Sequence, residues 1–408
     1  MNDDLDLAGL LSPGMQVFVG GGSNEPVALL ERLAATPECA AGVTFTQFPL
    51  PGLNRYDLSV LADGARARSF FMAPHLRAGF DAGRVQFVPM QMRAAYEYLR
   101  AQRFDVVFTQ VAYDRDGELR FGPNVDFIDA ALDGAGCVIA ELNRAFLAPA
   151  GAPRVDSNRI DHLVESNRVL TGLPSPEPDT AAREIGRIVA SLVPDGACIQ
   201  TGIGAIPAAI LGALGEKNDL GLHSGLIDEG GRQLIDQGVM TGAHKAIDTK
   251  VHVVGMGIGG TDLFDWLAQT PSVVFKGANY THEVAVIGRL ERFISINSAV
   301  EIDLLGQVNA EFAAGRQISG TGGSVDFMRA ARSSPGGRSI VAMTATAGGG
   351  KFSRIVARVP VVTALRTDVD IVVTEFGVAE LGPLDVAARA EALIAIAAPQ
   401  FREQLRAQ

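Results

Sequence analysis

The segment Gly202-Ile203-Gly204-Ala205-Ile206 has the residue types of an anion-binding loop. The short apolar run before it is typical of a buried strand. The residues after it stay apolar or small, and a proline in the first turn of a helix costs no hydrogen bond. A strand, a glycine loop and a helix start aim backbone amides and the positive end of the helix dipole at one point. The same pattern would also serve as a plain tight turn.

A second amide-rich loop is expected over residues 318–327 (ISGTGGSVDF). Its glycines are Gly320, Gly322 and Gly323. Beyond it, residues 344–350 (TATAGGG) supply flexible backbone, and Lys351 and Arg354 supply positive charge. An apolar strand further on would deliver Glu375 at its carboxyl end, where parallel sheets place their ligands.

Composition predicts a soluble, enzyme-sized protein with a large core. The 408 residues are 47% hydrophobic and include 46 glycines, which favours two domains. A formal net charge of −11 argues against nucleic acid or an anionic membrane as a partner. Three scattered cysteines and no metal-ligand spacing predict reduced thiols, no metal and a cytoplasmic location. The N-terminus lacks a signal-peptide pattern, and no apolar run reaches transmembrane length.

Two segments share one pattern and indicate similar domains in tandem. Residues 12–33 and 194–214 each combine a turn, a strand, a glycine loop and a helix that begins at a proline. We therefore expect an α/β protein with two open domains, each with a parallel-rich sheet and a loop at the carboxyl end of a strand. The proline-bearing segment 173–180 is the linker candidate and divides the chain into residues 1–180 and 181–408.

A further glycine pattern at residues 251–260 (VHVVGMGIGG) matches the form of a dinucleotide fingerprint. In such folds an acidic residue at the end of the next strand binds the ribose. Here the next apolar run ends at Lys276. A nicotinamide cofactor is therefore not expected.

Four C-terminal segments, INSAVEIDLLGQVNAE, ISGTGGSVDFMRAA, SRIV and LRTDVDIVVTEFGVAEL, together resemble the acetyl-CoA hydrolase/transferase family, which includes 4-hydroxybutyrate and acetate CoA-transferases. The resemblance is long over residues 199–405 and thinner in the N-terminal half, where it rests on GGSNEP, AELN and HLVES. It implies two tandem domains of the class I CoA-transferase type, usually in a homodimer, with the active site between the domains. It also implies an acyl-CoA and a carboxylate as substrates.

The resemblance implies a covalent mechanism and a set of binding residues. In the family's transferases a glutamate attacks the thioester and passes through an acyl-glutamyl anhydride to a glutamyl-CoA thioester. Loop amides stabilise the oxyanion. Glu375 is similar to the family's second active-site carboxylate, or it is a structural partner for a loop amide. The residues implied to contact coenzyme A or its thioester are Gly202, Ile203, Gly204, Ala205, Ile206, Gly320, Gly322 and Gly323.

The sequence departs from the family pattern where the nucleophile belongs. The family's His-Thr-Glu-Met motif is replaced by His223-Ser224-Gly225-Leu226, so that Gly225 occupies the nucleophile position. His282 stands where family members commonly carry Asn. The segment 380–383 (ELGP) also lacks the family's Leu-Arg-Gly-Lys.

Three functions stay open at this stage. A CoA-transferase would need a relocated carboxylate, for which Asp228 and Glu229 are candidates; either residue could instead be a solvated loop charge. An acyl-CoA hydrolase could activate water through Glu375, His223 or His282, although either histidine could be structural. A protein that binds coenzyme A without catalysis is the third alternative.

Overall fold

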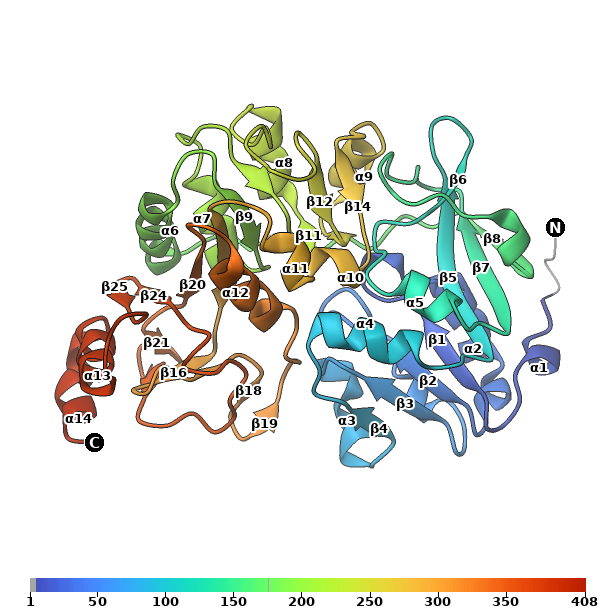
Figure 1. The fold of residues 1–408 in the computed structure, drawn as a ribbon. Helices are drawn as coiled ribbons and strands as arrows, with labels where there is room; N and C mark the ends of the chain where they lie inside the picture. Colours follow the sequence, from blue (N-terminus) through green and yellow to red (C-terminus); the bar gives the residue numbers. More distant parts are fainter. Residues whose placement is uncertain (1–4, 175) are drawn as a thin grey trace. The chain divides into compact units, whose positions relative to one another are not determined.

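The computed structural model describes residues 5–174 and 176–408 and confirms the α/β class (Figure 1). Two compact units divide the chain. Unit 1 consists of Met1–Pro174 and Val253–Tyr280, and unit 2 of Ser175–His252 and Thr281–Gln408. The chain therefore returns to unit 1 once after entering unit 2. The predicted domain boundary between residues 180 and 181 stays a prediction. A single boundary of this kind does not describe how residues 253–280 come to belong to unit 1.

Unit 1 is organised around a sheet in the order β4-β3-β2-β1-β5-β7-β8, with β6 beside β5. The seven strands of this path run parallel, and β6 is antiparallel. The chain moves outward from β1 to β4 and then returns to β5, so β1 and β5 flank the point where the strand order reverses. The strands are β1 (Gln16–Val19), β2 (Thr44–Gln47), β3 (Arg66–Ser69), β4 (Val85–Phe87), β5 (Val106–Tyr113), β6 (Leu119–Phe121), β7 (Cys137–Asn143) and β8 (His162–Ser166).

Helices of unit 1 follow the strands that sequence patterns predicted. Residues 12–33, which share the sequence pattern of residues 194–214, have their glycine loop after β1, where a 3-10 turn (Gly22–Asn24) leads to α2. The apolar runs at residues 103–112 and 136–142 form β5 and β7. The helices are α1 (Leu7–Leu10), α2 (Val27–Ala35), α3 (Arg77–Asp81), α4 (Met92–Arg100), α5 (Ile128–Leu132), α9 (Thr261–Leu267) and α10 (Ala278–Thr281).

Unit 2 is organised around a sheet in the order β10-β9-β15-β20-β24-β25. All of its strands are parallel except β25, which forms a hairpin with β24. Here the strand order reverses between β9 and β15, so the loop after β9 occupies the same topological place as the loop after β1. The strands are β9 (Cys198–Thr201), β10 (Gly221–Leu222), β15 (Phe293–Ser298), β20 (Arg338–Ala342), β24 (Ile371–Thr374) and β25 (Gly377–Glu380).

The helices of unit 2 begin with α6, which starts where the linker candidate 173–180 ends. Asp179 caps it, since Oδ1 accepts from the Ala182 amide at 2.8 Å. Its Gly186 permits close packing on α7, because a Cβ there would lie 2.6 Å from the Ala209 carbonyl oxygen. The helices are α6 (Thr180–Leu192), α7 (Ala205–Gly212), α8 (Glu229–Asp236), α11 (Val284–Ile287), α12 (Ser324–Ser333), α13 (Val386–Ala395) and α14 (Arg402–Arg406).

Short strands complete the two units. They are β11 (Leu226–Ile227), β12 (His252–Val254), β13 (Met256–Gly257), β14 (Val273–Phe275), β16 (Glu301–Asp303), β17 (Val308–Asn309), β18 (Phe312–Ala313), β19 (Arg316–Gln317), β21 (Thr346–Ala347), β22 (Phe352–Ser353) and β23 (Ile355–Val356). Strands β12 and β14 form a separate two-stranded sheet. The glycine pattern at 251–260 therefore does not open a dinucleotide-binding βαβ unit of either main sheet. Among the described residues, no helix is long and apolar enough to cross a membrane.

Candidate active site

The loop from Gly202 to Ile206 joins β9 to α7 at the carboxyl edge of the unit 2 sheet. Gly204 has φ +115°, a conformation open mainly to glycine. It is the N-cap of α7, and no side chain caps that helix start. A Cβ at Gly202 or Gly204 would meet no atom within 4 Å. The first amides of α7 therefore lie beneath open space, as anion binding at a helix start requires.

The second predicted loop ends at Gly323, the N-cap of α12, and no side chain caps this helix start either. Gly322 has φ +59° and so turns the chain into the helix. Gly320 is buried, whereas Gly322 and Gly323 are partly exposed. Both glycine loops predicted from the sequence therefore lead into a helix, α7 or α12, whose start has no side-chain cap.

His282 lies against Gly225, which the resemblance predicts to be at the nucleophile position. A Cβ on Gly225 would be 3.2 Å from both Cε1 and Nε2 of the His282 ring. A Cβ on Gly323 would be 2.3 Å from Nε2 and Cδ2 of the same ring, which no real structure tolerates. The structure therefore brings together three residues that the sequence marked separately. The imidazole requires glycine at 323, and a side chain at 225 would be in tight contact with it.

The His282 imidazole is neutral at physiological pH. The side chain is buried, with 2% exposure, and burial lowers its pKa to about 3. Nδ1 is 2.8 Å from Thr281 Oγ1 in a hydrogen bond, and the Phe327 ring lies 4.5 Å away between centroids. A neutral imidazole has one N–H donor and one acceptor nitrogen, so His282 can hold a proton at a fixed atom without carrying charge.

The residues beside Gly225 are bound into the backbone. Ser224 Oγ donates to the Thr201 carbonyl at 3.3 Å and accepts from the Leu226 amide at 3.4 Å. His223 is fully buried, and its ring meets Phe293 edge on at 6.4 Å between centroids. These contacts fix the segment after β10.

Asp228 and Glu229, the candidate relocated carboxylates, belong to the start of α8. Asp228 is its N-cap, and Oδ1 accepts from the Gly231 amide at 3.0 Å. Burial nevertheless raises the pKa of Asp228. Glu229 forms an ion pair with Arg232, with 3.3 Å between Oε2 and Nη1. Both carboxylates therefore stabilise the first turn of α8.

Glu375 lies between β24 and β25 and binds a loop amide, the alternative that the sequence left open. Its Oε2 accepts from the Ala345 amide at 2.8 Å. The Ala345 carbonyl in turn accepts from the Arg354 amide at 2.9 Å. Glu375 therefore holds the start of the segment that carries Arg354, and its partly exposed carboxylate keeps a second oxygen.

Three buried polar residues of unit 2 were given no role by the sequence. Gln200 on β9 and Asn297 on β15 exchange side-chain hydrogen bonds of 3.2 and 3.0 Å at the point where the strand order reverses. Lys245 is buried, and its Nζ donates to the carbonyls of Leu222 at 3.1 Å and Val251 at 2.6 Å. Lys245 thus positions the end of β10, two residues before Ser224. A lone lysine far away in the chain gave no sequence signal.

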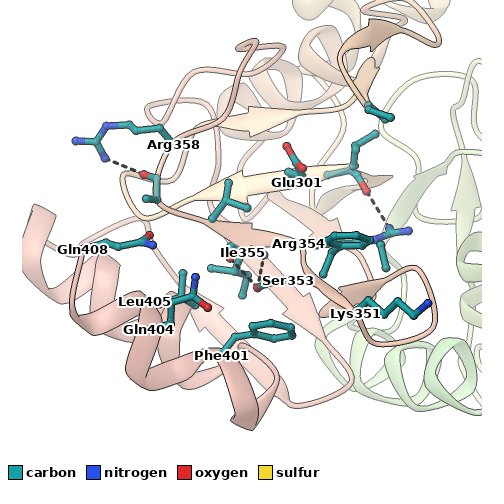
Figure 2. Close-up of a pocket in the computed structure, with 18 of the residues that line it drawn as sticks. Glu301, Lys351, Ser353, Arg354, Ile355, Arg358, Phe401, Gln404, Leu405 and Gln408 are labelled. Atoms are coloured by element: carbon teal, nitrogen blue, oxygen red, sulfur yellow. Dashed lines mark hydrogen bonds between the residues drawn. The ribbon is translucent and has the colours of Figure 1, made fainter.

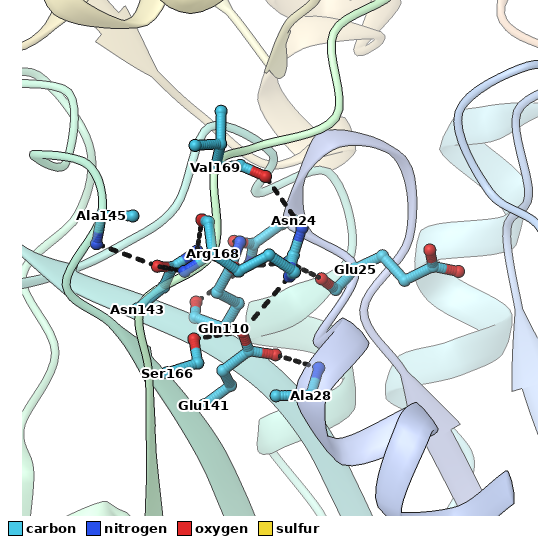
Figure 3. A network of polar contacts seen from close by, with 10 residues as sticks. All are labelled: Asn24, Glu25, Ala28, Gln110, Glu141, Asn143, Ala145, Ser166, Arg168 and Val169. Atoms are coloured by element: carbon cyan, nitrogen blue, oxygen red, sulfur yellow. Dashed lines mark hydrogen bonds and ion pairs between the residues drawn. The ribbon is translucent and has the colours of Figure 1, made fainter.

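Unit 1 carries a polar network at the carboxyl ends of its strands (Figure 3). Glu141 on β7 is fully buried and accepts from the Ala28 amide at 2.8 Å and from Ser166 Oγ at 2.6 Å. Arg168 donates to Gln110 Oε1 at 3.1 Å. The network joins GGSNEP, AELN and HLVES, the three short motifs on which the N-terminal resemblance rested.

Glu25, in the same network, has a carboxyl group with a raised pKa. Burial raises its pKa to about 7, although a hydrogen bond with Asn54 and the charge of Arg168 act in the opposite direction. The group therefore changes its charge near neutral pH. The sequence offered no sign of this shift, because it depends on how the loop after β1 folds.

Comparisons with known proteins show the family and the fold. Two family models match, the acetyl-CoA hydrolase/transferase N-terminal domain over residues 2–170 and the C-terminal domain over residues 259–408. The chain is 36% identical to a 4-hydroxybutyrate coenzyme A transferase of Clostridium kluyveri, across 93% of this chain and 90% of that protein. It is 27% identical to an acetyl-CoA hydrolase of Candida albicans, across 62% of this chain and 50% of that protein. The crystal structure of RipA from Yersinia pestis superimposes with a TM-score of 0.91 at 30% identity, across 98% and 94% of the two chains.

Proposed function

Because this chain belongs to the acetyl-CoA hydrolase/transferase family, we propose that it is an acyl-CoA:carboxylate CoA-transferase. One observation carries the proposal: two uncapped helix starts, α7 and α12, face the carboxyl edge of a single sheet. Backbone amides there can stabilise the oxyanion of a thioester under attack. The homodimer and the cytoplasmic location stay predictions of the sequence.

Gly225 cannot provide the carboxylate that the covalent mechanism implied by the resemblance requires. The nearest candidates in sequence, Asp228 and Glu229, have structural contacts in α8. We therefore favour transfer in which the acceptor itself attacks. A carboxylate oxygen of the acceptor bonds to the thioester carbonyl carbon, the C–S bond breaks, and the CoA thiolate leaves. The thiolate then attacks the acceptor carbonyl of the mixed anhydride, the C–O bond breaks, and the donor acid departs as its carboxylate.

In this scheme His282 serves as a donor. When Nδ1 accepts a hydrogen bond from the Thr281 hydroxyl, the proton of the neutral ring is on Nε2, and this Nε2–H donor lies beside Gly225. A neutral donor stabilises a developing oxyanion without giving up a proton, as other neutral histidines do in enolisation. The low pKa of His282 fits this role better than that of a general base, because a base is most effective when its pKa lies near the working pH.

An acyl-CoA hydrolase is the second candidate, and the missing side chain at Gly225 favours it. Without an enzyme carboxylate at this position, water would have to attack the thioester, and Glu375, which keeps a second carboxylate oxygen beyond its bond to the Ala345 amide, is the carboxylate that could activate it. A protein that binds coenzyme A without catalysis is the third candidate, for which loss of the nucleophile is the only support.

Initial-rate kinetics on the purified chain distinguish the candidates. A transferase converts acyl-CoA only when a carboxylate is added and releases no net thiol, whereas a hydrolase releases thiol from acyl-CoA alone. Direct attack by the acceptor gives intersecting double-reciprocal lines and no adduct. Parallel lines, with a CoA adduct on Glu229 or Glu375 in the mass spectrum, would instead establish an enzyme nucleophile. Binding of coenzyme A without either activity would leave the third candidate.

A further inference from the structure

The carboxyl edge of the unit 2 sheet differs between its two sides. Beyond β15 and β20 it borders a large cavity, whose lining includes Glu301, Lys351 and Arg354 (Figure 2). On the other side lies β10, the outermost strand, which has two residues and pairs with β9 alone. The segment 223–225 follows this strand directly. The backbone at the candidate active site therefore continues a very short strand that has a partner strand on one side only.

The pairing of β10 leaves the Leu222 carbonyl without a strand partner. The Gly221 amide donates to the Ala197 carbonyl at 2.8 Å. The His223 amide donates to the Ile199 carbonyl at 3.1 Å. Because alternate residues of a parallel strand form their hydrogen bonds on opposite sides, the Leu222 carbonyl points away from β9, toward the edge where the sheet ends. Leu222 is 2% exposed, so this buried carbonyl needs a donor from the protein.

Lys245 provides that donor from a loop, where a further strand would otherwise lie. Its Nζ donates to the Leu222 carbonyl at 3.1 Å and to the Val251 carbonyl at 2.6 Å. The side chain is buried, with 4% exposure. Burial lowers the pKa of Lys245, but the ammonium and the neutral amine each have an N–H for both carbonyls. Lys245 therefore closes the sheet edge at the last residue of β10.

The loop around Lys245 fixes this side chain in place. The Gly242 amide donates to the Leu220 carbonyl at 2.8 Å, and the Gly242 carbonyl accepts from the Lys245 amide at 3.2 Å. The Lys245 carbonyl accepts from Thr249 Oγ1 at 2.8 Å. Gly221 leaves room for the alkyl chain, because a Cβ there would lie 2.9 Å from Cγ and 3.0 Å from Cδ of Lys245. The lysine is therefore held at its backbone, along its alkyl chain and at Nζ.

We propose that Lys245 is a positioning residue for the reaction: through the Leu222 carbonyl it holds the segment 223–225 where Gly225 faces the Nε2–H donor of His282. The inference rests on the proposed function, in which that donor stabilises the thioester oxyanion. A Cβ on Gly225 would be 3.2 Å from the His282 ring, so a small shift of the strand end changes this contact. A misplacement of about 1 Å can reduce a rate by about 100-fold.

Kinetics of the variant Lys245→Met test this role, because methionine keeps most of the apolar chain and removes the donor. We expect kcat to fall by about 10–100-fold while KM for acyl-CoA is unchanged, since the glycine loops are left intact. The matched control Lys250→Met removes an exposed lysine of the same loop and should keep the parent's kcat. An unchanged kcat in Lys245→Met, or an equal fall in Lys250→Met, would overturn the positioning role.

A double-mutant cycle separates positioning from a general loss of stability. Gly225→Ala places a methyl group against the His282 ring, and its effect on kcat should depend on whether Lys245 holds the segment. We expect Gly225→Ala to cause a smaller fold-loss of kcat in the Lys245→Met background than in the parent. Additive effects would show that Lys245 stabilises its loop without setting this contact, and would contradict the proposal.

Hydrogen exchange of the full chain tests the same contact without turnover. Peptides that contain residues 222–226 should exchange faster in Lys245→Met than in the parent, and at the parent's rate in Lys250→Met. Gly221→Ala serves if Lys245→Met does not fold, because its Cβ displaces the alkyl chain of Lys245 and should also give faster exchange and a lower kcat. Exchange at the parent's rate in the folded variant would overturn the role of Lys245. The exchange result stands even if the chain turns over no acyl-CoA, so failure of the proposed function is recognised separately.

Discussion

The ring of His282 lies 3.2 Å from the point where a Cβ on Gly225 would be, measured to both Cε1 and Nε2. The two positions at which the resemblance predicts a departure from the family pattern therefore contact each other. A side chain at 225 would project toward the imidazole, and the imidazole occupies space that the smaller Asn of other members would leave open.

This contact predicts that Gly225→Glu alone fails to restore a covalent mechanism. Gly225 is partly exposed, but its side chain would press on the buried His282 ring. Overpacking costs about 1–3 kcal/mol, so the variant should be less stable in urea and should form no glutamyl-CoA adduct. The double variant Gly225→Glu/His282→Asn removes the opposing ring. It should recover the parent's stability and yield an adduct with acyl-CoA, detected by intact-protein mass spectrometry. A single variant as stable as the parent would show that the ring moves aside freely.

Gly323 provides a second test of the same packing. A Cβ there would lie 2.3 Å from the His282 ring, so Gly323→Ala should lower the free energy of unfolding by about 1–3 kcal/mol. Combining it with His282→Ala should remove most of that penalty, as a double-mutant cycle would show. Gly202→Ala is the control, because its Cβ meets no atom within 4 Å. Additive effects of Gly323→Ala and His282→Ala would contradict the contact.

Glu25 should make unit 1 less stable as the pH rises. Its pKa in the folded chain is about 7 against an ordinary 4.5, so the folded state binds an extra proton between these values. Stability is therefore lost as pH rises from 4.5 to 7. Glu25→Gln should match the parent near pH 4 and exceed it by about 1–3 kcal/mol at pH 8 in urea titrations. The exposed Glu31→Gln is the control. Identical pH profiles of parent and Glu25→Gln would refute the shift.

His282 should act in the opposite direction. Its folded pKa is about 3 against an ordinary 6.5, so the unfolded chain takes up a proton first as the solution is acidified. Stability is fully present above pH 6.5 and falls toward pH 3 by about 1.4 kcal/mol per pH unit. In urea unfolding between pH 4 and 6, His282→Asn should reduce the change in the free energy of unfolding per pH unit by the contribution of one proton. The buried His252, whose pKa is lowered to about 4, should still contribute to the pH dependence of stability in that variant. A slope unchanged by His282→Asn would mean that the imidazole is not desolvated.

Local sequence signals determined the elements and the loops. The strand before Gly202, the helix that begins at Ala205 and the strand before Glu375 are found where the apolar runs, glycines and proline predicted them. Each depends on neighbours in the chain, namely on turn chemistry and on the tolerance of a helix start for proline. The resemblance likewise identified the family from short segments, whereas the missing nucleophile at Gly225 stays a prediction.

Only the tertiary structure decided which of these residues meet. Gly225, His282 and Gly323 are far apart in sequence and share one contact because strands β10, β15 and β20 lie in one parallel sheet. The same holds for Arg354 and Glu375, which are linked through the backbone of Ala345. The pKa values of His282 and Glu25 also depend on burial, a property of packing that no single segment carries. The sequence by itself therefore specified the parts of the site, and the packing of distant segments determined their contacts and their charge.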